Sequence, residues 1–378
     1  MSYNGMQDAD LPLKLQMSNF LWNQGYICRP CIPLYHYSEG KRTTKTFTDI
    51  DILGIKFTGI EKPRKVVCSA KSGEDSDAQQ LFWLSGVKSY FEADEAIYIR
   101  NKGGIYGVTE LLKKLGIQGF NQNELMRLIK NMHLDLKRPR YINSMECYTN
   151  TNKCFLELKK INLELYRYLT ERYWIEGPHL GVLKTINCVN DIKSSKLDLI
   201  TKKFLIYYCI SLFVISIIQI INKLSSIPNE FFINSLETEF MGGEYSEREK
   251  KILANKIEAF MRQYARFFEK EPSISIDKIF DFSSLIKTPY SAELSELCTR
   301  LRESSSILMF LPQIFDVIAF EIFQQNLTIK DNSFIQSINN FNDDEKKIIG
   351  KSIKDILFFY EKIKLFERND IKLFIDIL

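Results

Sequence analysis

The sequence has few histidines, and none stands in a catalytic arrangement. Its three histidines, His36, His133 and His179, have neither the partners of a Ser-His-Asp triad nor the spacing of a metal site around them. The chain also lacks the G-x-x-x-x-G-K-[ST] loop that binds nucleotide phosphates, and its Gly-Gly pairs are isolated turn signals. These absences argue against a triad hydrolase and against a P-loop enzyme.

The eight cysteines form no recognisable zinc or disulfide framework. Only Cys28 and Cys31 have a suggestive spacing, and neither His36 nor the distant Cys68 completes a zinc site with them. We interpret Cys28 and Cys31 as two small apolar side chains on a strand. The chain starts without an apolar signal peptide, so we expect a reducing, cytoplasmic location.

The composition lacks the biases of a disordered, collagenous or low-complexity chain. Apolar residues make up 45% of the 378 positions, charged residues 26% and aromatic residues 13%. Such a chain can commit nearly its whole length to packed cores. At about 100–200 residues per domain, it has room for two or three domains.

The net charge is also small, at +4, but the positive excess is unevenly distributed along the chain. Residues 1–140 contain 20 Lys and Arg against 15 Asp and Glu, whereas residues 141–378 contain 31 against 32. The excess in the first third is compatible with a polyanionic partner for that part. Ordinary fluctuation in a lysine-rich sequence explains the charge equally well.

Helical and strand patterns alternate up to about residue 132. Pro30 and Pro33 make the first expected strand either an edge strand or an interrupted one. The order predicts an α/β domain over residues 1–140, with a small mixed sheet flanked by helices. The patterns predict helices over 11–24, 77–92, 108–115 and 122–132, and strands over 26–37, 47–57, 65–70 and 95–100.

From about residue 141 the pattern is helical, without a fixed repeat. We therefore predict a second, all-helical region over residues 141–378, whose role the sequence does not assign. The basic, proline-broken run Lys137-Arg138-Pro139-Arg140 is the expected linker. The long amphipathic segments are 154–174, 197–223, 246–269, 291–302, 305–325 and 343–366.

Residues 204–222 form the one long uncharged run of the chain. Its 19 residues would reach across a bilayer, so a membrane span is one interpretation. A buried core helix is the other, and we favour it because polar side chains dilute the run and charged amphipathic helices surround it. The diluting residues are Tyr207, Tyr208, Ser211, Ser216 and Gln219.

Two neighbouring expected strands carry the residues with the clearest chemistry. Side chains alternate along a strand, so Asp49 and Asp51 share one face, and Ser69 and Lys71 share a face of the next strand. If the two strands are adjacent, the four side chains converge at one end. Carboxylate oxygens suit Mg²⁺ or Mn²⁺, and a nearby lysine could orient a water and offset charge at a phosphorus.

In this arrangement residues 11–132 resemble the PD-(D/E)xK nuclease superfamily, and within it the Mrr-like restriction endonuclease-like group. Asp51 matches the metal-binding Asp of that motif, and Lys71 matches its Lys, followed here by Ser72-Gly73. Gln79 or Gln80 resembles the glutamine that often lines the site. The resemblance implies a restriction endonuclease-like fold, a metal-dependent DNA nuclease, and a setting in restriction or anti-phage defence.

The sequence departs from that motif at two acidic positions. Ser69 stands where the motif has an acidic residue, and the helical glutamate often found upstream would fall near Gln16 or Asn19. Asp49 lies close enough to Asp51 to replace the missing carboxylate. Three more acidic candidates follow Lys71 in the chain: Glu74, Asp75 and Asp77.

The leading hypothesis is a Mg²⁺- or Mn²⁺-dependent nuclease that hydrolyses phosphodiester bonds in DNA. Asp49 and Asp51 would hold the metal, Lys71 would position the attacking water, and Ser69 and Gln80 would be secondary ligands or orienting groups. A localised basic face would contact the DNA backbone. Its candidate residues are Lys41, Arg42, Lys45, Arg64, Lys65, Lys137, Arg138 and Arg140.

Three other interpretations stay open. The nuclease-like part could be catalytically inactive and bind nucleic acid or a partner, with the helical region mediating assembly, including assembly of copies of this chain. The run 204–222 could anchor a membrane-associated effector. Asp49, Asp51 and Lys71 could also be ordinary surface residues of a sheet with one solvated face.

Overall fold

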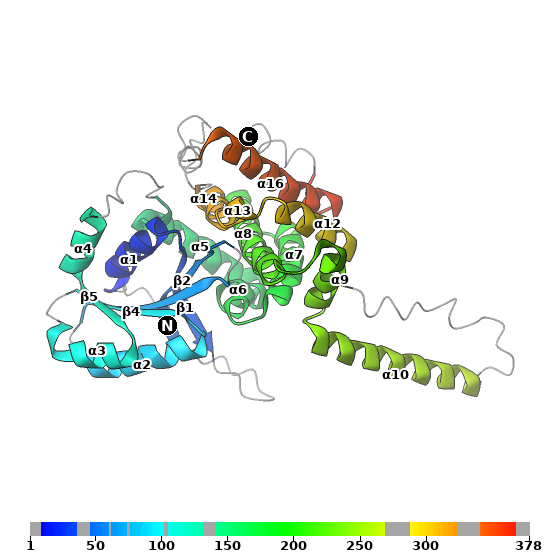
Figure 1. The fold of residues 1–378 in the computed structure, drawn as a ribbon, viewed down its shortest axis with the longest axis horizontal. Coiled ribbons are helices and arrows are strands. Elements are labelled where there is room, and N and C mark those ends of the chain that lie inside the picture. Colours follow the sequence, from blue (N-terminus) through cyan, green and yellow to red (C-terminus); the bar gives the residue numbers. More distant parts are fainter. Residues whose placement is uncertain are drawn as a thin grey trace.

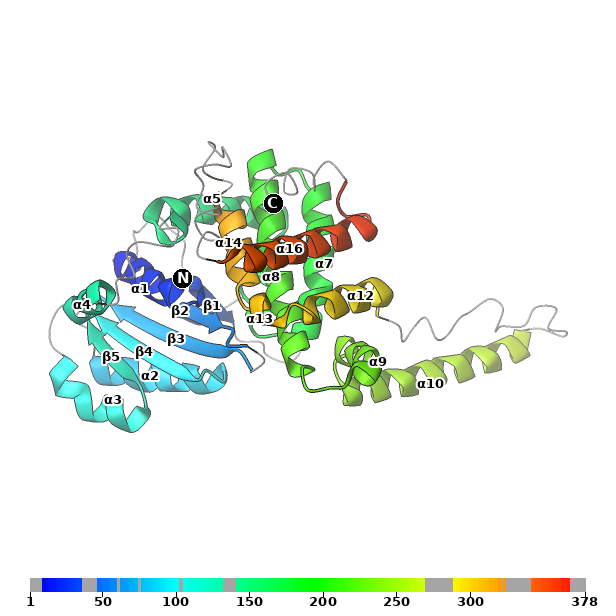
Figure 2. The ribbon, with the colours of Figure 1, turned by 45° about the horizontal axis from the view of Figure 1, so that its top comes forward.

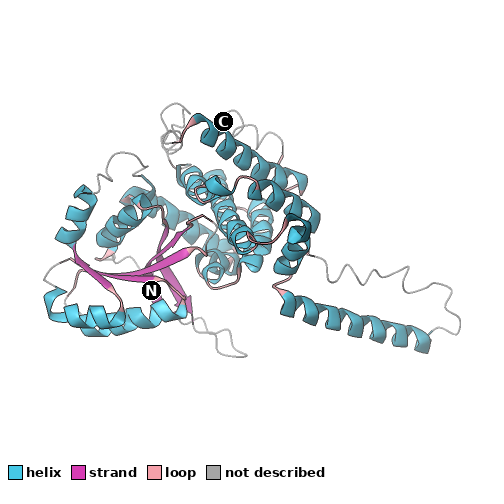
Figure 3. Cartoon of the chain, in the orientation of Figure 1, coloured by secondary structure: helices cyan, strands magenta, loops and turns pink. Residues whose placement is uncertain are grey.

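The computed structural model of the chain describes residues 9–35, 46–59, 62–73, 76–101, 105–131, 141–268, 288–321, 323 and 341–367. Within these residues a five-stranded mixed sheet fills the N-terminal part, and helices make up most of the rest (Figures 1 and 3). This confirms the predicted α/β unit followed by a helical region.

The sheet has the strand order β1-β2-β3-β4-β5. The first two pairings are antiparallel, whereas β3 with β4 and β4 with β5 are parallel. Strand β1 lies at an edge of this order, as Pro30 and Pro33 predicted. The four residues of β5 carry too short a pattern to be predicted. The strands are β1 (Ile27–Tyr35), β2 (Thr46–Lys56), β3 (Arg64–Lys71), β4 (Glu95–Arg100) and β5 (Gln118–Asn121).

Helices cover both faces of the sheet. Helices α1 (Leu11–Asn23) and α4 (Gln122–Asn131) lie on one face, and α2 (Asp77–Tyr90) and α3 (Thr109–Leu115) lie on the other (Figures 1 and 2). The short η1 (Ile105–Val108) precedes α3. Apolar α1 residues spaced three or four apart pack on the sheet, because this spacing aligns them on one side of a helix. They include Leu13, Met17 and Leu21.

Two helices that lie outside the predicted segments start at prolines. Pro178 is the first residue of α7 (Pro178–Ser194), and Pro228 precedes α9 (Asn229–Phe240). Proline suits a helix start because its missing N–H has no intrahelical partner there. The other elements are η3 (Tyr141–Asn143), α5 (Met145–Ile161), α6 (Leu163–Thr170), η4 (Arg172–Trp174), α8 (Leu199–Lys223), α10 (Glu244–Phe268), α12 (Ser291–Arg302), α13 (Ser305–Leu308), α14 (Leu311–Glu321) and α16 (Asp343–Lys362).

The predicted single helix over 154–174 is two helices. Asn162 ends α5 and begins α6, because its side-chain oxygen accepts the backbone N–H of Leu165 at 3.0 Å. An asparagine N-cap satisfies a donor that the start of a helix leaves unpaired. The amphipathic pattern continues across this break, which is why periodicity alone did not detect it.

Helix α8, which contains the uncharged run, is the centre of the helical region. By length and hydropathy it could cross a membrane, with a mean hydropathy of 2.4 over its most apolar window. However, 83% of that window is buried inside the structure, where α7 and α14 pack against the helix (Figure 2). This burial supports the core-helix interpretation over the membrane span.

A buried ion pair joins the sheet to the helical region. Arg29 of β1 is 5% exposed and Asp316 of α14 is fully buried. Two parallel hydrogen bonds connect them, with Nη1 to Oδ2 at 2.7 Å and Nη2 to Oδ1 at 2.6 Å. Tyr208 and Ser211 of α8 also bond to this pair. These bonds hold the edge strand β1 against the helical region, so this part of the strand is not open to solvent.

Helices α7 and α8 approach closely at Gly181, which predicts a stability effect. An added Cβ there would lie 2.2 Å from the Ser216 Oγ and 3.2 Å from the Tyr173 ring. Tyr173 and Ser216 are themselves hydrogen-bonded at 2.9 Å, so neither can move freely. We expect Gly181→Ala to lower the free energy of unfolding by about 1–3 kcal/mol through overpacking, as measured by urea denaturation.

Gly86 provides the matched control, because it lies on the exposed side of α2 with no atom within 4 Å of an added Cβ. We expect Gly86→Ala to raise the free energy of unfolding by about 0.5–1 kcal/mol, since alanine loses less backbone entropy in a helix. Equal effects of the two substitutions would contradict the packing explanation.

Candidate functional site

The candidate site lies where strands β2 and β3 separate. Their backbone pairing ends at Ile52 and Cys68. Beyond this point the Asp51 side chain, and not the β2 backbone, bonds to β3. Its Oδ2 accepts the backbone N–H of Ala70 at 2.9 Å and the Ser69 hydroxyl at 3.3 Å. The carboxylate is 3% exposed, so the hydrogen bonds that hold it compensate part of its lost hydration.

Lys71 stands at the end of β3 and contacts two carboxylates. Its Nζ lies 3.7 Å from Asp51 Oδ2 and 3.9 Å from Asp10 Oδ2. Asp10 is held beside it by Ser72, whose backbone N–H donates to Asp10 Oδ1 at 2.6 Å and whose hydroxyl also bonds there. The structure therefore brings Asp51, Ser69 and Lys71 together, and adds Asp10 to them.

Lys14 of α1 forms the shortest ion pair with the site. Its Nζ lies 2.7 Å from Asp51 Oδ1, and the lysine is only 2% exposed. The same Nζ is 3.9 Å from the sulfur of Cys31, which has a φ of 56° and lies between Pro30 and Ile32, the strand partners of Ile52 and Ile50. Lys14 and Lys71 thus approach Asp51 through different oxygens.

Asp49 is half-buried on β2, two residues before Asp51. Burial raises the pKa of its carboxyl above the ordinary value of 3.8, and the charge of Asp51 raises it further, whereas Lys14 and Lys71 lower it. Burial acts in this direction because it disfavours the charged form of a carboxyl. Asp49 is therefore part of the same electrostatic network as Asp51.

The raised pKa of Asp49 predicts a pH-dependent stability effect. The folded chain holds a proton on Asp49 at pH values where the unfolded chain has released it, so this residue stabilises the fold most at low pH. Its contribution is lost as the pH rises from 3.8 through the folded pKa. We expect Asp49→Asn to increase the free energy of unfolding at pH 7 and to change it little at the acidic end of that range.

Denaturant titrations of the wild type and of Asp49→Asn at several pH values between 4 and 7.5 would test this. A stability difference that is independent of pH would contradict a perturbed Asp49.

No relative of the chain is found. No family model, no curated protein and no solved structure matches the sequence or the fold. The resemblance to PD-(D/E)xK nucleases thus depends on the residues of the motif alone.

The residues of the site do not fit a divalent metal well. Mg²⁺ is usually bound by one or two carboxylates that are free to coordinate it, whereas both Asp51 oxygens contact lysine nitrogens. Ser69 contributes a hydroxyl where a nuclease would have a carboxylate. Among the described residues, no group of three or more His, Cys, Asp or Glu side chains is placed to hold a metal ion.

Gln80 lies in the first turn of α2, where its backbone N–H bonds to the Ser76 carbonyl at 3.2 Å. The α2 residue that connects to the sheet is Asp77, which accepts a hydrogen bond from the Tyr98 hydroxyl at 2.7 Å and pairs with Arg100. Asp77 is thus engaged with β4 and not with Asp51. Glu74 and Asp75 lie outside the described residues.

The expected DNA contacts are only partly described. Arg64 and Lys65 begin β3, so seven residues of extended strand, about 20 Å, separate them from Lys71 at its other end. Lys65 is half-buried, bonds to the Phe91 carbonyl at 3.3 Å, and has a lowered pKa because of burial. Lys41, Arg42, Lys45, Lys137, Arg138 and Arg140 lie outside the described residues.

Sequence reasoning missed Lys14 and Asp10. The upstream helical position was expected near Gln16 or Asn19, but Gln16 instead hydrogen-bonds to Gln122 of α4. Lys14 is the residue of α1 that contacts Asp51. The available signal was its spacing, because Lys14 lies three and seven residues before the buried Met17 and Leu21. A lysine on the apolar side of a helix requires a buried partner.

Proposed function

We propose that the N-terminal α/β unit is a nuclease-like domain that binds nucleic acid without cleaving it. The observation that carries the proposal is the contact of Lys14 Nζ with Asp51 Oδ1 at 2.7 Å, with both side chains removed from solvent. The lysine ammonium supplies the positive charge that Asp51 would otherwise take from a metal. Asp51 then has a structural role, which is to neutralise Lys14 and to join β2 to β3.

The charge balance around Asp51 supports this proposal. Two lysines contact one carboxylate whose remaining hydrogen-bonding capacity is taken by Ala70 and Ser69. A metal would have to displace Lys14 from Asp51 and so break a buried ion pair. Breaking such a pair costs several kcal/mol, so the ion pair competes strongly with metal binding.

Nucleic-acid binding is supported by the charge distribution and by the resemblance. The positive excess lies in residues 1–140, where Lys41, Arg42 and Lys45 lie within five residues of one another. Each phosphate contact that a protein makes with duplex DNA makes the slope of log K against log[salt] more negative by about 0.9. Arg64 is exposed at the start of β3 and is a further candidate contact.

A cleavage and metal-binding experiment tests the absence of catalysis. We expect the wild type to show no Mg²⁺- or Mn²⁺-dependent cleavage of DNA and no Mn²⁺ binding by titration calorimetry. We expect the double variant Lys14→Glu/Ser69→Glu to gain Mn²⁺ binding, because it restores two carboxylates beside Asp51. Wild-type cleavage that is lost in both Asp51→Ala and Lys71→Ala would overturn the proposal.

A salt titration tests the binding part separately. We expect duplex DNA binding to weaken with salt, and the variant Lys41→Ala/Arg42→Ala/Lys45→Ala to reduce the salt slope by about 3, the equivalent of three phosphate contacts. The double variant Lys346→Ala/Lys347→Ala removes exposed lysines from α16 and serves as a charge control. An equal loss in both variants would argue against a local nucleic-acid face.

A metal-dependent DNA nuclease is the second candidate function. Asp10 and Asp51 both contact Lys71, and Asp49 interacts electrostatically with Asp51 and Lys71. Three carboxylates around one lysine are the observation that favours catalysis, with Asp51 and Lys71 as the essential residues. The cleavage assay above separates the two candidates directly.

A further inference from the structure

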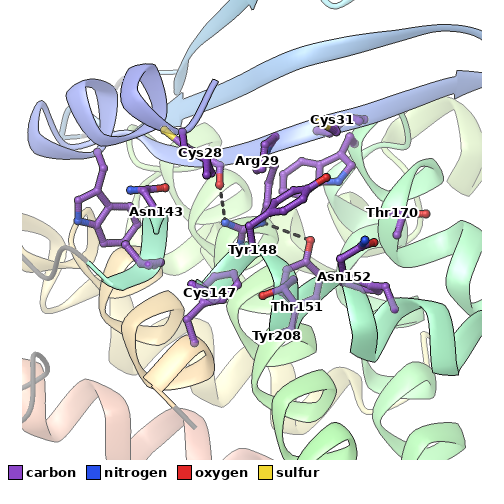
Figure 4. A pocket seen from close by; sticks show the side chains of 18 of the residues that line it. Cys28, Arg29, Cys31, Asn143, Cys147, Tyr148, Thr151, Asn152, Thr170 and Tyr208 are labelled. Carbon is purple, nitrogen blue, oxygen red and sulfur yellow. Dashed lines mark hydrogen bonds between the residues drawn. The ribbon is translucent and has the colours of Figure 1, made fainter. Parts of the chain in front are cut away.

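A pocket lies between the edge strand β1 and the helical region, apart from the Asp51 cluster (Figure 4). Its volume is about 100 Å³, below the roughly 300–1,000 Å³ of sites for drug-sized ligands, which limits an occupant to a small ring. Strand β1 forms one wall, and residues of α1, η3, α5, α6, η4, α8 and α14 supply the others. Seven of the nineteen lining residues are aromatic, among them Trp22, Phe155, Tyr166, Trp174, Tyr208 and Phe320.

The pocket has a charged residue but little net charge. Arg29 lines it, yet its guanidinium is held by both oxygens of Asp316 and by the Cys28 carbonyl and the Tyr208 hydroxyl. The rings of Trp174, Tyr208 and Phe320 lie 5.0–5.7 Å from its central carbon. A phosphate or carboxylate would therefore find the cation already neutralised, so the pocket suits an uncharged ligand.

Buried polar groups of the lining lack a hydrogen-bond partner, among them the side-chain amide of Asn143. Asn143 of η3 is 7% exposed, and its Nδ2 has no hydrogen-bond acceptor in the structure. An unsatisfied buried amide costs about 1–3 kcal/mol, and a ligand with an acceptor atom would remove that cost. Tyr148, Thr151 and Asn152 of α5 add further polar groups to the lining (Figure 4).

We propose that this pocket binds an uncharged nucleobase-type heterocycle. The aromatic walls provide stacking surfaces, which recognise the flat face of any base. The Asn143 amide provides an edge-on hydrogen bond, and asparagine is well suited to adenine because it can donate to N7 and accept from the N6 amino group. The proposal is independent of whether the Asp51 cluster is catalytic.

Intrinsic fluorescence gives a direct readout, because two of the three tryptophans of the chain, Trp22 and Trp174, line the pocket. In a Trp83→Phe background, we expect adenine or adenosine to quench the fluorescence in a saturable way. We expect AMP to bind no more tightly than adenosine. We expect Asn143→Ala to weaken binding about tenfold, and Asn234→Ala, at an exposed position of α9, to have no effect.

Asn143→Asp guards against a folding defect, since it keeps the size of the side chain and replaces the donor with an acceptor. We expect it also to lose adenine binding while its thermal unfolding stays cooperative. Indole, a flat ring without an acceptor, should bind at least tenfold more weakly than adenine. If a short single-stranded oligonucleotide binds more tightly than adenosine, the pocket's ligand is a base within a nucleic-acid strand and not a free base.

Three results would overturn the proposal. They are no saturable response to adenine, adenosine, cytosine or the oligonucleotide up to millimolar concentration, equal binding of indole and adenine, and binding that is unchanged in both Asn143 variants.

Discussion

Asp316→Asn is expected to lower the free energy of unfolding by about 3–5 kcal/mol, which is the cost of leaving a buried cation without its partner. Asp316 is fully buried and accepts hydrogen bonds from Nη1 and Nη2 of Arg29, at 2.7 and 2.6 Å. The substitution keeps the shape of the side chain and removes the charge. Arg29 cannot reach solvent instead, because Trp174, Tyr208 and Phe320 enclose its guanidinium.

Urea denaturation followed by circular dichroism would measure this loss. The double variant Arg29→Met/Asp316→Leu should recover most of the stability, because a well-packed apolar pair can replace a buried ion pair at little cost. Arg262→Ala is the surface control, since Arg262 and Glu258 form an exposed pair on α10 that should contribute less than about 1 kcal/mol. A loss at Asp316 no larger than this control would mean that Arg29 stays hydrated.

Asp51→Asn is expected to be the second strongly destabilising substitution, again by about 3–5 kcal/mol. It removes the carboxylate that lies 2.7 Å from the buried Lys14 amine, and at this position it leaves Lys14 and Lys71 facing a neutral group. Lys14→Met should cost less, because Asp51 keeps Lys71, the Ala70 N–H and the Ser69 hydroxyl. The double variant Lys14→Met/Asp51→Asn should be more stable than Asp51→Asn alone.

The direction of this effect distinguishes the two candidate functions. In a metal site without its metal, neighbouring carboxylates repel one another, so replacing one of them relieves repulsion and stabilises the protein. In an ion pair, the same replacement removes the charge that the lysine contacts and so destabilises the protein. A gain of stability in Asp51→Asn, measured in the presence of a chelator, would contradict the structural role of Asp51.

The periodicity of the sequence was sufficient for the elements that have a clear apolar pattern. Helix α1 and the strands β2, β3 and β4 lie within a few residues of the predicted ranges. Their buried apolar residues, such as Met17, Ile52 and Val67, follow a helical or an alternating spacing. The apolar pattern did not predict the helix ends that individual residues determine, as at Asn162 and Pro178. It also failed at β5, whose position depends on pairing with β4 and not on its own sequence.

For the candidate site, alternation along the strands correctly grouped Asp51, Ser69 and Lys71. It could not include Lys14 or Asp10, because their positions depend on how α1 packs across the sheet. Arg29 was missed for a similar reason. Its partner Asp316 lies in a different part of the chain, and no local pattern relates residues that meet only in the tertiary structure.

The Arg29–Asp316 pair has a consequence for biosynthesis. The two residues are 287 positions apart in sequence, and at about 5–20 residues per second a ribosome needs roughly 15–60 s to bridge that interval. During this time β1 has emerged but the helix that covers it has not. The N-terminal sheet therefore completes its folding only after Asp316 has been made, and until then its exposed edge would benefit from a chaperone.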